Sequence, residues 1–263
     1  MPSGELYYEE SGEGPVVVLG HAGIADHTMW DDQVGPFSER YRVIRYDLRG
    51  FGRSSTPETG YAPHDDLRAL LAHLDIERAA LVGVSISGGI ALDFALAHPE
   101  MLWALVPVAA GMDGYDWSAD EALQRFGAEE KAAVEAGDID RAVDLNVRLW
   151  VDGPGRGPEQ VAHAVREKVR RMQRAIFERG EPAGQPVPLE PLAITRLEDI
   201  CAPTLAIVGD QDARALVEIT DLIARRVPSA QKAVIRDTAH LPNIERPDEF
   251  NRLVLDFLAS VAP

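Results

Sequence analysis

The chain has 263 residues, of which 46% are hydrophobic, enough to bury a core and too many for a disordered protein. Its formal net charge of −17 repels nucleic-acid phosphates and anionic lipid, and no basic patch offsets it, so we expect neither nucleic acid nor a membrane as partner. The single cysteine, Cys201, excludes an intramolecular disulfide, and no Cys or His cluster has the spacing of a structural zinc site.

The amino-terminal segment has no basic stretch followed by an apolar run, which a secretory signal would need. No segment reaches the roughly 18 consecutive apolar residues that a membrane-spanning helix requires. We therefore expect the protein to reside in the cytoplasm.

The first half of the chain alternates apolar runs with segments of helical periodicity. Four runs predict buried strands, at residues 16–20, 41–46, 79–84 and 103–110. They are almost continuously apolar, as are strands that helices cover on both faces. Helical periodicity at 65–74 and after Ser85 supplies the crossovers. An α/β fold with a mostly parallel twisted sheet is predicted.

The strand pattern disappears after about residue 112 and returns near 197. Helical segments between Gly- and Pro-rich clusters replace it. The clearest helix has an apolar stripe formed by Val161, Val165, Val169, Met172 and Ile176. This segment is predicted to be an inserted helical subdomain.

Apolar strands resume at 204–209 and 232–237, and an amphipathic helix follows near 250–258. The insertion therefore interrupts one domain. We predict a core made of residues 1–111 and 198–263, with a helical lid at 112–197.

The most informative motif, LVGVSISGG at 81–89, places Ser85 directly between a strand and a helix. Small neighbours, here Gly83 and Ser87, are required because a nucleophile in this position sits on a strained strand-to-helix turn. Ser87 would lie within the first helical turn with its hydroxyl bonded to the backbone, so Ser85 is the candidate nucleophile. Ile86 is the first residue of this helix, so its backbone N–H has no acceptor within the helix. This amide is therefore the first expected oxyanion donor.

Three further segments accompany this elbow: LGHAGIADHTMW at 19–30, YDLRGFGRS at 46–54 and TAHLPNIERPDEF at 238–250. With them, the chain resembles the α/β-hydrolase superfamily almost from end to end. The closest resemblance is to its lid-bearing esterases, 3-oxoadipate enol-lactonases and cofactor-free haloperoxidases. The resemblance implies the α/β-hydrolase fold with an inserted lid, and it implies no metal and no organic cofactor.

The resemblance also implies a second oxyanion donor in the loop after His21. The backbone amide of Gly23 is the best match, with Ala22 in place of the usual glycine. His21 itself is interpreted as a structural residue that holds this loop. The loop with Asp47 and Arg49 is likewise interpreted as structural.

A serine hydroxyl becomes an effective nucleophile only beside a base, and His240 is the candidate among seven histidines because its loop follows the last strand. In this family the acid precedes the histidine in the chain. Asp212 matches the family position, whereas Asp210 is expected to bond the turn backbone. Asp113, after the strand at 103–110, stays an alternative acid.

Five residues are predicted to line the substrate pocket: Trp30, Met112, Phe126, Trp150 and Leu241.

Three arginines recur at helical spacing in the insertion: Arg166, Arg170 and Arg174. They are expected to form a solvated face, with Glu167 paired to Arg171; the alternative is a cationic face for a substrate carboxylate.

The residues thus predict a serine hydrolase that cleaves a small-molecule carboxylic ester or lactone through an acyl-enzyme, with the triad Ser85, His240 and Asp212. Two alternatives use the same residues. One is a lyase, or cofactor-free oxygen or peroxide chemistry, in which His240 is the base and Ser85 is not acylated. The other is a non-catalytic small-molecule receptor.

Overall fold

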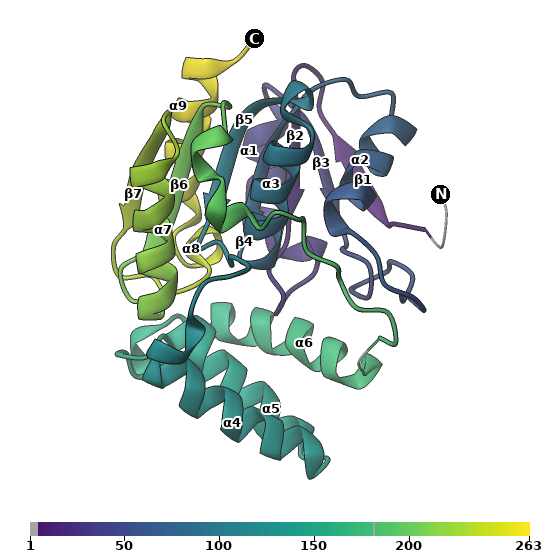
Figure 1. The fold of residues 1–263 in the computed structure, drawn as a ribbon. Helices are drawn as coiled ribbons and strands as arrows, with labels where there is room; N and C mark the ends of the chain where they lie inside the picture. Colours follow the sequence, from purple (N-terminus) through teal and green to yellow (C-terminus); the bar gives the residue numbers. More distant parts are fainter. Residues whose placement is uncertain (1–4, 181) are drawn as a thin grey trace.

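A seven-stranded sheet forms the centre of this computed structural model, which describes residues 5–180 and 182–263 (Figure 1). The strand order is β1-β3-β2-β4-β5-β6-β7, and only the β1–β3 pair is antiparallel. The strands are Tyr8–Ser11 (β1), Val16–Gly20 (β2), Arg42–Tyr46 (β3), Ala79–Val84 (β4), Leu102–Val108 (β5), Thr204–Gly209 (β6) and Ala230–Ile235 (β7). The predicted mostly parallel sheet is confirmed.

The observed strands differ from the prediction at the edges of the sheet. The sequence did not predict β1, whose residues YEES lack an apolar run and pair with one neighbour only. The predicted strand at 232–237 begins and ends two residues earlier, and Asp237 lies beyond it with φ 56°. The strand predicted at 103–110 ends at Val108, because Ala109 turns to φ 43°. Left-handed backbone cannot continue a strand.

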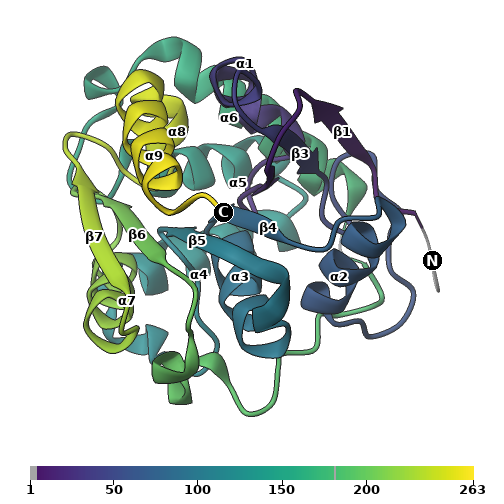
Figure 2. The ribbon, with the colours of Figure 1, turned by 90° about the horizontal axis from the view of Figure 1, so that it is seen from above.

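Helices cover both faces of the sheet (Figure 2). One face carries α1 (Asp31–Ser38), α8 (Pro242–Glu245) and α9 (Pro247–Val261), and the other carries α2 (Pro63–His73), α3 (Ile86–Ala97) and α7 (Arg214–Arg226). The side chains of successive strand residues point to opposite faces of the sheet, and each face has its own hydrophobic core. In β2, Val17 packs in the core with Phe250, whereas Val18 packs in the core with Phe94. This alternation explains why the strands are almost continuously apolar.

A helical insertion separates β5 from β6 and lies beyond the carboxyl ends of the strands (Figure 1). It contains α4 (Glu121–Glu135), α5 (Ile139–Asn146), a π-helical turn at Val147–Asp152 and α6 (His163–Arg179). The helix predicted around Val165, Val169 and Met172 is therefore present, although it begins only after Val161. The function of this insertion as a lid stays a prediction.

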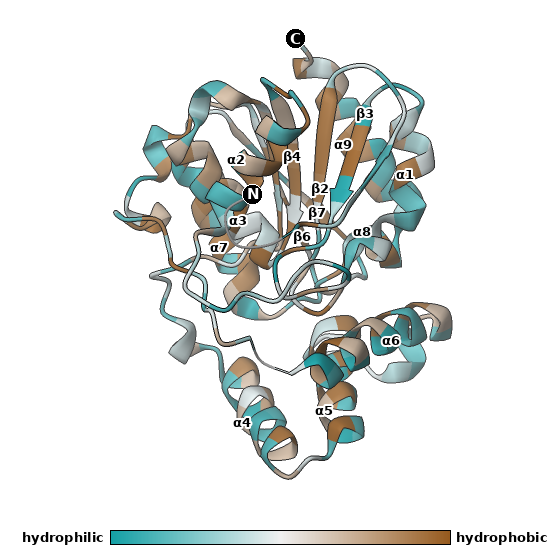
Figure 3. Ribbon diagram, turned by 90° about the vertical axis from the view of Figure 1, so that its right-hand side faces the viewer, coloured by the Kyte–Doolittle hydropathy of each residue, from teal (hydrophilic) through white to brown (hydrophobic). Residues whose placement is uncertain are grey.

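Hydropathy differs between the sheet and the insertion (Figure 3). The strands are mostly hydrophobic, whereas the helices of the insertion carry hydrophilic and hydrophobic residues together. Of the helices that the structure describes, none combines the length and the apolar character needed to cross a bilayer.

Candidate active site

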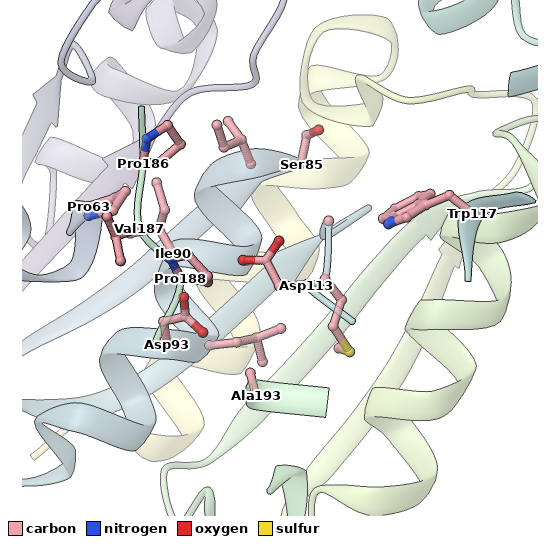
Figure 4. A pocket seen from close by; sticks show the side chains of 15 residues that line it. Pro63, Ser85, Ile90, Asp93, Asp113, Trp117, Pro186, Val187, Pro188 and Ala193 are labelled. Carbon is pink, nitrogen blue, oxygen red and sulfur yellow. The ribbon is translucent and has the colours of Figure 1, made fainter. Parts of the chain in front are cut away.

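Ser85 occupies the turn between β4 and α3. Its backbone has φ 57° and ψ −115°, a strained conformation for a residue with a side chain. Hydrogen bonds hold the turn: the Ser85 amide donates to the carbonyl of Val108 at 2.9 Å, and its own carbonyl accepts from the amides of Gly89 at 3.1 Å and Gly111 at 2.9 Å. The backbone is thus satisfied, and the half-buried side chain lines a cavity (Figure 4).

Small residues are a steric requirement of this elbow. A Cβ atom on Gly83 would lie 2.3 Å from the carbonyl oxygen of Ser87, and one on Gly20 would lie 2.7 Å from the Cβ of Ser87. The buried Ser87 hydroxyl donates to the carbonyl of His21 at 2.6 Å. The prediction that Ser87 bonds to backbone is confirmed, and the bond joins the elbow to the loop after β2.

The loop after β2 brings Gly23 beside Ile86, since a Cβ on Gly23 would lie 3.8 Å from Ile86 Cγ2. His21 fixes this loop: its Nε2 accepts from the amide of Leu48 at 2.9 Å and its Nδ1 lies 2.8 Å from the carbonyl of Ala22. Complete burial lowers the pKa of His21. Among the described residues, neither the Gly23 amide nor the Ile86 amide donates to a protein acceptor, so a ligand oxygen can accept from both.

His240 lies in the loop between β7 and α8 and contacts Asp212, which follows β6. Its Nδ1 is 3.0 Å from Asp212 Oδ2, and both side chains are almost fully buried. The other carboxylate oxygen accepts from the amide of Ala213 at 2.8 Å. The Trp150 ring packs against the imidazole, with 4.5 Å between the two ring centroids. The backbone carbonyl of Trp150 accepts a hydrogen bond from the His240 amide at 3.2 Å. Because Nδ1 faces the carboxylate, Nε2 is left for proton exchange.

Ser85 and the Asp212–His240 pair lie at the same edge of the sheet, on loops that follow β4, β6 and β7. In the described part of the chain, the Ser85 hydroxyl makes no hydrogen bond with His240. Such contacts are often long before a substrate binds. The structure therefore pairs the predicted acid with the predicted base and puts the predicted nucleophile at the same edge.

The two alternative acids lie elsewhere. Asp210 accepts from the amide of Asp237 at 2.7 Å, which joins the loops after β6 and β7, as expected for a residue that bonds the turn backbone. Asp113 lines the cavity and is not a partner of His240. Of the three acids, Asp212 is the one that contacts the imidazole.

A buried arginine of the insertion, Arg156, holds the loop that carries His240. Its guanidinium donates to the carbonyls of Asp152 at 2.7 Å and Asp237 at 2.6 Å, and to Glu245 Oε2 at 2.7 Å. Glu245 Oε1 in turn accepts from the amide of Ala239 at 2.6 Å. Burial raises the pKa of Glu245 to about 7, and the charge of Arg156 opposes that rise.

The insertion also passes between the two loops that carry Asp212 and His240. At Gly153, with φ 81°, a Cβ atom would lie 2.3 Å from the carbonyl oxygen of Gln211 and 3.2 Å from the Cβ of Ala239. Only glycine suits both this conformation and this close approach. The segment around Gly153 and Arg156 therefore belongs to the frame of the site, and no sequence pattern had indicated either residue.

A cavity of about 340 Å³ opens at Ser85 and extends along α3 (Figure 4). Its walls are mostly apolar, with Ile90 from α3, Met112 from the segment after β5, Trp117, and the strap at 186–188. Two carboxylic acids, Asp93 and Asp113, also line it.

The pocket residues were predicted less accurately than the elbow. Met112 lines the cavity as predicted. The prediction is wrong for Trp30 and Leu241, which are both fully buried in the hydrophobic core. Trp150 contacts His240 and does not line this cavity. Phe126, on α4, is also outside its lining, and the guanidinium of the neighbouring Arg125 covers its ring at 4.9 Å.

The arginines of α6 are bonded within the insertion. Arg166 Nε donates to Asp152 at 2.7 Å, while Arg170 pairs with Asp144 and Arg174 with Asp140. They therefore join α6 to the preceding helical segments, and none lines the cavity at Ser85.

The predicted pair of Glu167 with Arg171 is wrong. Glu167 Oε1 accepts instead from Arg170 Nε at 3.2 Å, one position earlier on the helix. Both spacings are compatible with a helix, so the sequence alone could not choose between them.

One cluster of described residues, Asp26, His27 and Asp47, brings three potential metal ligands together. Protein donors already engage the Asp47 carboxylate: the amides of His27 and Arg53 both donate at 2.8 Å, and the His27 ring lies 2.9 Å away. The cluster therefore holds the loop after β3, in agreement with the structural interpretation of that loop.

Comparison with known proteins places these features in context. Residues 16–253 match the model of a family described as the alpha/beta hydrolase family. A pimeloyl-[acyl-carrier protein] methyl ester esterase of Aeromonas hydrophila is 28% identical, covering 95% of this chain and 98% of that protein. The 3-oxoadipate enol-lactonase 1 of Acinetobacter baylyi is 25% identical, covering 94% and 90%. The solved structure of Est816, described as an N-acyl homoserine lactone degrading enzyme, superposes with a TM-score of 0.75 at 28% identity over 97% of both chains.

The elbow sterics can be tested with Gly83→Ala. Because the added methyl group would meet the backbone of Ser87, we expect a loss of about 1–3 kcal/mol in the free energy of unfolding. Gly127→Ala is the matched control, since Gly127 lies within α4 with open space around it; the control should be stabilised by up to about 1 kcal/mol. Equal stability of the two variants in urea unfolding would contradict the steric argument.

The Arg156–Glu245 pair gives a second prediction. Arg156→Met leaves a buried carboxylate without its cation, and we expect a loss of about 3–5 kcal/mol. Arg141→Met, which removes an exposed pair with Glu129, should cost less than about 1 kcal/mol. The double variant Arg156→Met/Glu245→Met should recover part of the loss, because no buried charge is then left unpaired. Thermal unfolding compares the stability of the wild type, the two single variants and the double variant. An Arg156→Met variant as stable as Arg141→Met would refute the role of Arg156 in holding the His240 loop.

Proposed function

Because the chain belongs to the alpha/beta hydrolase family, we propose that it hydrolyses a carboxylic ester or lactone of a small molecule, with Ser85 as nucleophile, His240 as general base and Asp212 as the residue that orients the histidine. The observation that carries this proposal is the buried contact of 3.0 Å between His240 Nδ1 and Asp212 Oδ2, at the edge of the sheet that holds the strained Ser85 turn. A base oriented by a carboxylate near a serine elbow is the arrangement that activates a hydroxyl.

The first step is attack on the substrate carbonyl. The Ser85 hydroxyl gives its proton to His240 Nε2 while its oxygen bonds to the carbonyl carbon. Asp212 stabilises the imidazolium through Nδ1 without taking its proton. The carbonyl oxygen becomes an oxyanion and accepts from the amides of Gly23 and Ile86, each of which typically lowers such a barrier by about 2.7–4 kcal/mol.

The second step releases the alcohol. The tetrahedral intermediate collapses as the C–O bond to the leaving group breaks, and the imidazolium of His240 protonates the departing alkoxide. Ser85 is then acylated. A water molecule, deprotonated by His240, attacks the acyl-enzyme and releases the acid by the same sequence of transfers. In a lactone the acid and the alcohol leave as one molecule.

The helical insertion supports a lid at residues 112–197. It supplies Met112, Trp117 and the strap at 186–188 to the wall of the cavity that opens at Ser85. A substrate in this cavity would therefore be enclosed by the core on one side and by the insertion on the other. Exclusion of water at such a site strengthens the electrostatic interactions within it.

The relatives favour an ester or lactone over an amide, because those reported above are named as an esterase and lactonases. The same residues would also serve a lyase, cofactor-free oxygen or peroxide chemistry, or a receptor. Lyase chemistry and cofactor-free oxygen chemistry leave Ser85 unacylated, so a covalent adduct with a fluorophosphonate together with ester turnover favours the hydrolase over both.

The proposal predicts hydrolysis of p-nitrophenyl esters from acetate to octanoate. Ser85→Ala and His240→Ala should lower kcat by at least about 10⁴-fold, and Asp212→Asn by about 10⁴-fold, because the imidazole then loses its tautomer and its orientation. Asp210→Asn is the matched control: it keeps an oxygen for the Asp237 amide and should retain most activity.

Two results would overturn the proposal. One is a Ser85→Ala variant that still turns over these esters at the wild-type rate. The other is a folded wild type with neither ester turnover nor a fluorophosphonate adduct on Ser85, which would favour the lyase or the receptor.

A further inference from the structure

The cavity at Ser85 extends along one helix to an acidic end. Ser85 precedes α3, and Asp93 lies on the same helix, also in the cavity wall. Asp93 is seven positions after Ile86, so the helix carries the cavity wall roughly 10 Å from the elbow. Asp113 projects into the cavity from the segment after β5, between Ser85 and Asp93 in the view of Figure 4. A substrate chain bound along α3 with its carbonyl at Ser85 would pass both carboxyl groups.

The charge of this cavity is of one sign. Its 15 lining residues include two aspartates and no lysine, arginine or histidine. Burial and the charge of Asp113 raise the pKa of Asp93 to about 7, and a hydrogen bond from the backbone amide of Leu189 opposes that rise. The remaining wall is apolar, so the two carboxyl groups are poorly screened from each other.

A cation from a ligand would complete this arrangement. An ammonium group between the two carboxyl groups would favour their ionised forms and form charge-assisted contacts in a half-buried site. A ligand carboxylate would place a third negative group there and would be repelled. The net charge of −17 also draws cations toward the protein over longer distances.

We propose that the cavity selects esters or lactones whose chain ends in a cationic group several atoms from the carbonyl, and that Asp93 and Asp113 are the residues that set this specificity. The inference rests on the proposed function, in that it takes the cavity at Ser85 as the substrate site. Its apolar wall accommodates the methylene chain, and its acidic end recognises the terminal charge.

Three p-nitrophenyl esters of similar length test the proposal. They are the 6-trimethylammoniohexanoate, its neutral isostere the 7,7-dimethyloctanoate, and the monoester of adipic acid, which ends in a carboxylate. We expect kcat/KM for the cationic ester to exceed that of its isostere at least about tenfold, and the carboxylate ester to be the poorest of the three. The two isosteres share the same leaving group and chain length, so their ratio of kcat/KM reports the effect of the charge.

The variant Asp93→Asn/Asp113→Asn should bring the ratio of the isosteres close to one. Asp116→Asn is the control: it removes one carboxylate, from a nearby residue that does not line the cavity, and its amide oxygen can still accept from the amide of Ser118. That control should keep the wild-type ratio. A wild-type ratio of one, or an unchanged ratio in the double aspartate variant, would overturn the proposed specificity.

Binding keeps the two proposals distinguishable. Calorimetric titration with hexyltrimethylammonium and with hexanoate needs no turnover. Binding of the cation that is at least about tenfold weaker in Asp93→Asn/Asp113→Asn would support the charge specificity even if no ester were hydrolysed, in which case only the proposed function would fail. Turnover that depends on Ser85, with no preference for the cationic ester and no binding of hexyltrimethylammonium, would sustain the hydrolase and refute the specificity.

Discussion

The strained backbone of Ser85 is the constraint around which the rest of the site is arranged. A side-chain-bearing residue at φ 57° and ψ −115° costs on the order of 1–3 kcal/mol. The cost is offset by hydrogen bonds from both backbone groups of Ser85 and by close packing of the elbow. That packing leaves no room for a side chain at Gly83 or Gly20, and it allows Ser87 to bond to the loop that carries Gly23, one of the two proposed oxyanion donors. One turn thus fixes the proposed nucleophile and the amide of Ile86, and it is joined by a hydrogen bond to the loop that carries Gly23.

The proposed acid and base, Asp212 and His240, depend on a different support, which comes from the insertion. Gly153 lies between the loops that carry Asp212 and His240. Arg156 bonds to Glu245, which in turn bonds to the His240 loop, and the Trp150 carbonyl accepts from the His240 amide. The segment at 150–156, after α5, is therefore tied to the core by these contacts. The strap at 186–188 contributes cavity wall and takes no part in these contacts. Sequence changes in the strap can alter the cavity while the acid and base keep their support.

The α/β-hydrolase fold could be predicted because its signals are local. A continuous apolar run predicts a buried strand, and a serine between such a run and a helix, with small residues on each side, predicts an elbow from sterics alone. Cavity walls have no such signal. Trp30 ends a 3₁₀ turn and Leu241 precedes α8, and nothing in the sequence around either apolar residue distinguishes core from cavity wall. Asp93 lies within an otherwise apolar helix, ISGGIALDFALA, and a charged residue there was the one sequence signal for the acidic end of the cavity. Arg156 and Glu245 are 89 residues apart, and their pairing depends on tertiary packing.

An acidic cavity beside an oxyanion site has a consequence for the chemistry. In the proposed reaction, attack by Ser85 would create negative charge at the amides of Gly23 and Ile86, and the carboxylates of the cavity would disfavour that charge. A cation on the substrate opposes their field. Its effect is therefore larger in the transition state than in the ground state, because the developing oxyanion feels the unscreened carboxylates only if no cation is present. Interactions that strengthen in the transition state raise kcat as well as kcat/KM. The two aspartates would then discriminate between substrates during the chemical step as well as on binding, and an uncharged substrate would be slow even when the cavity is saturated.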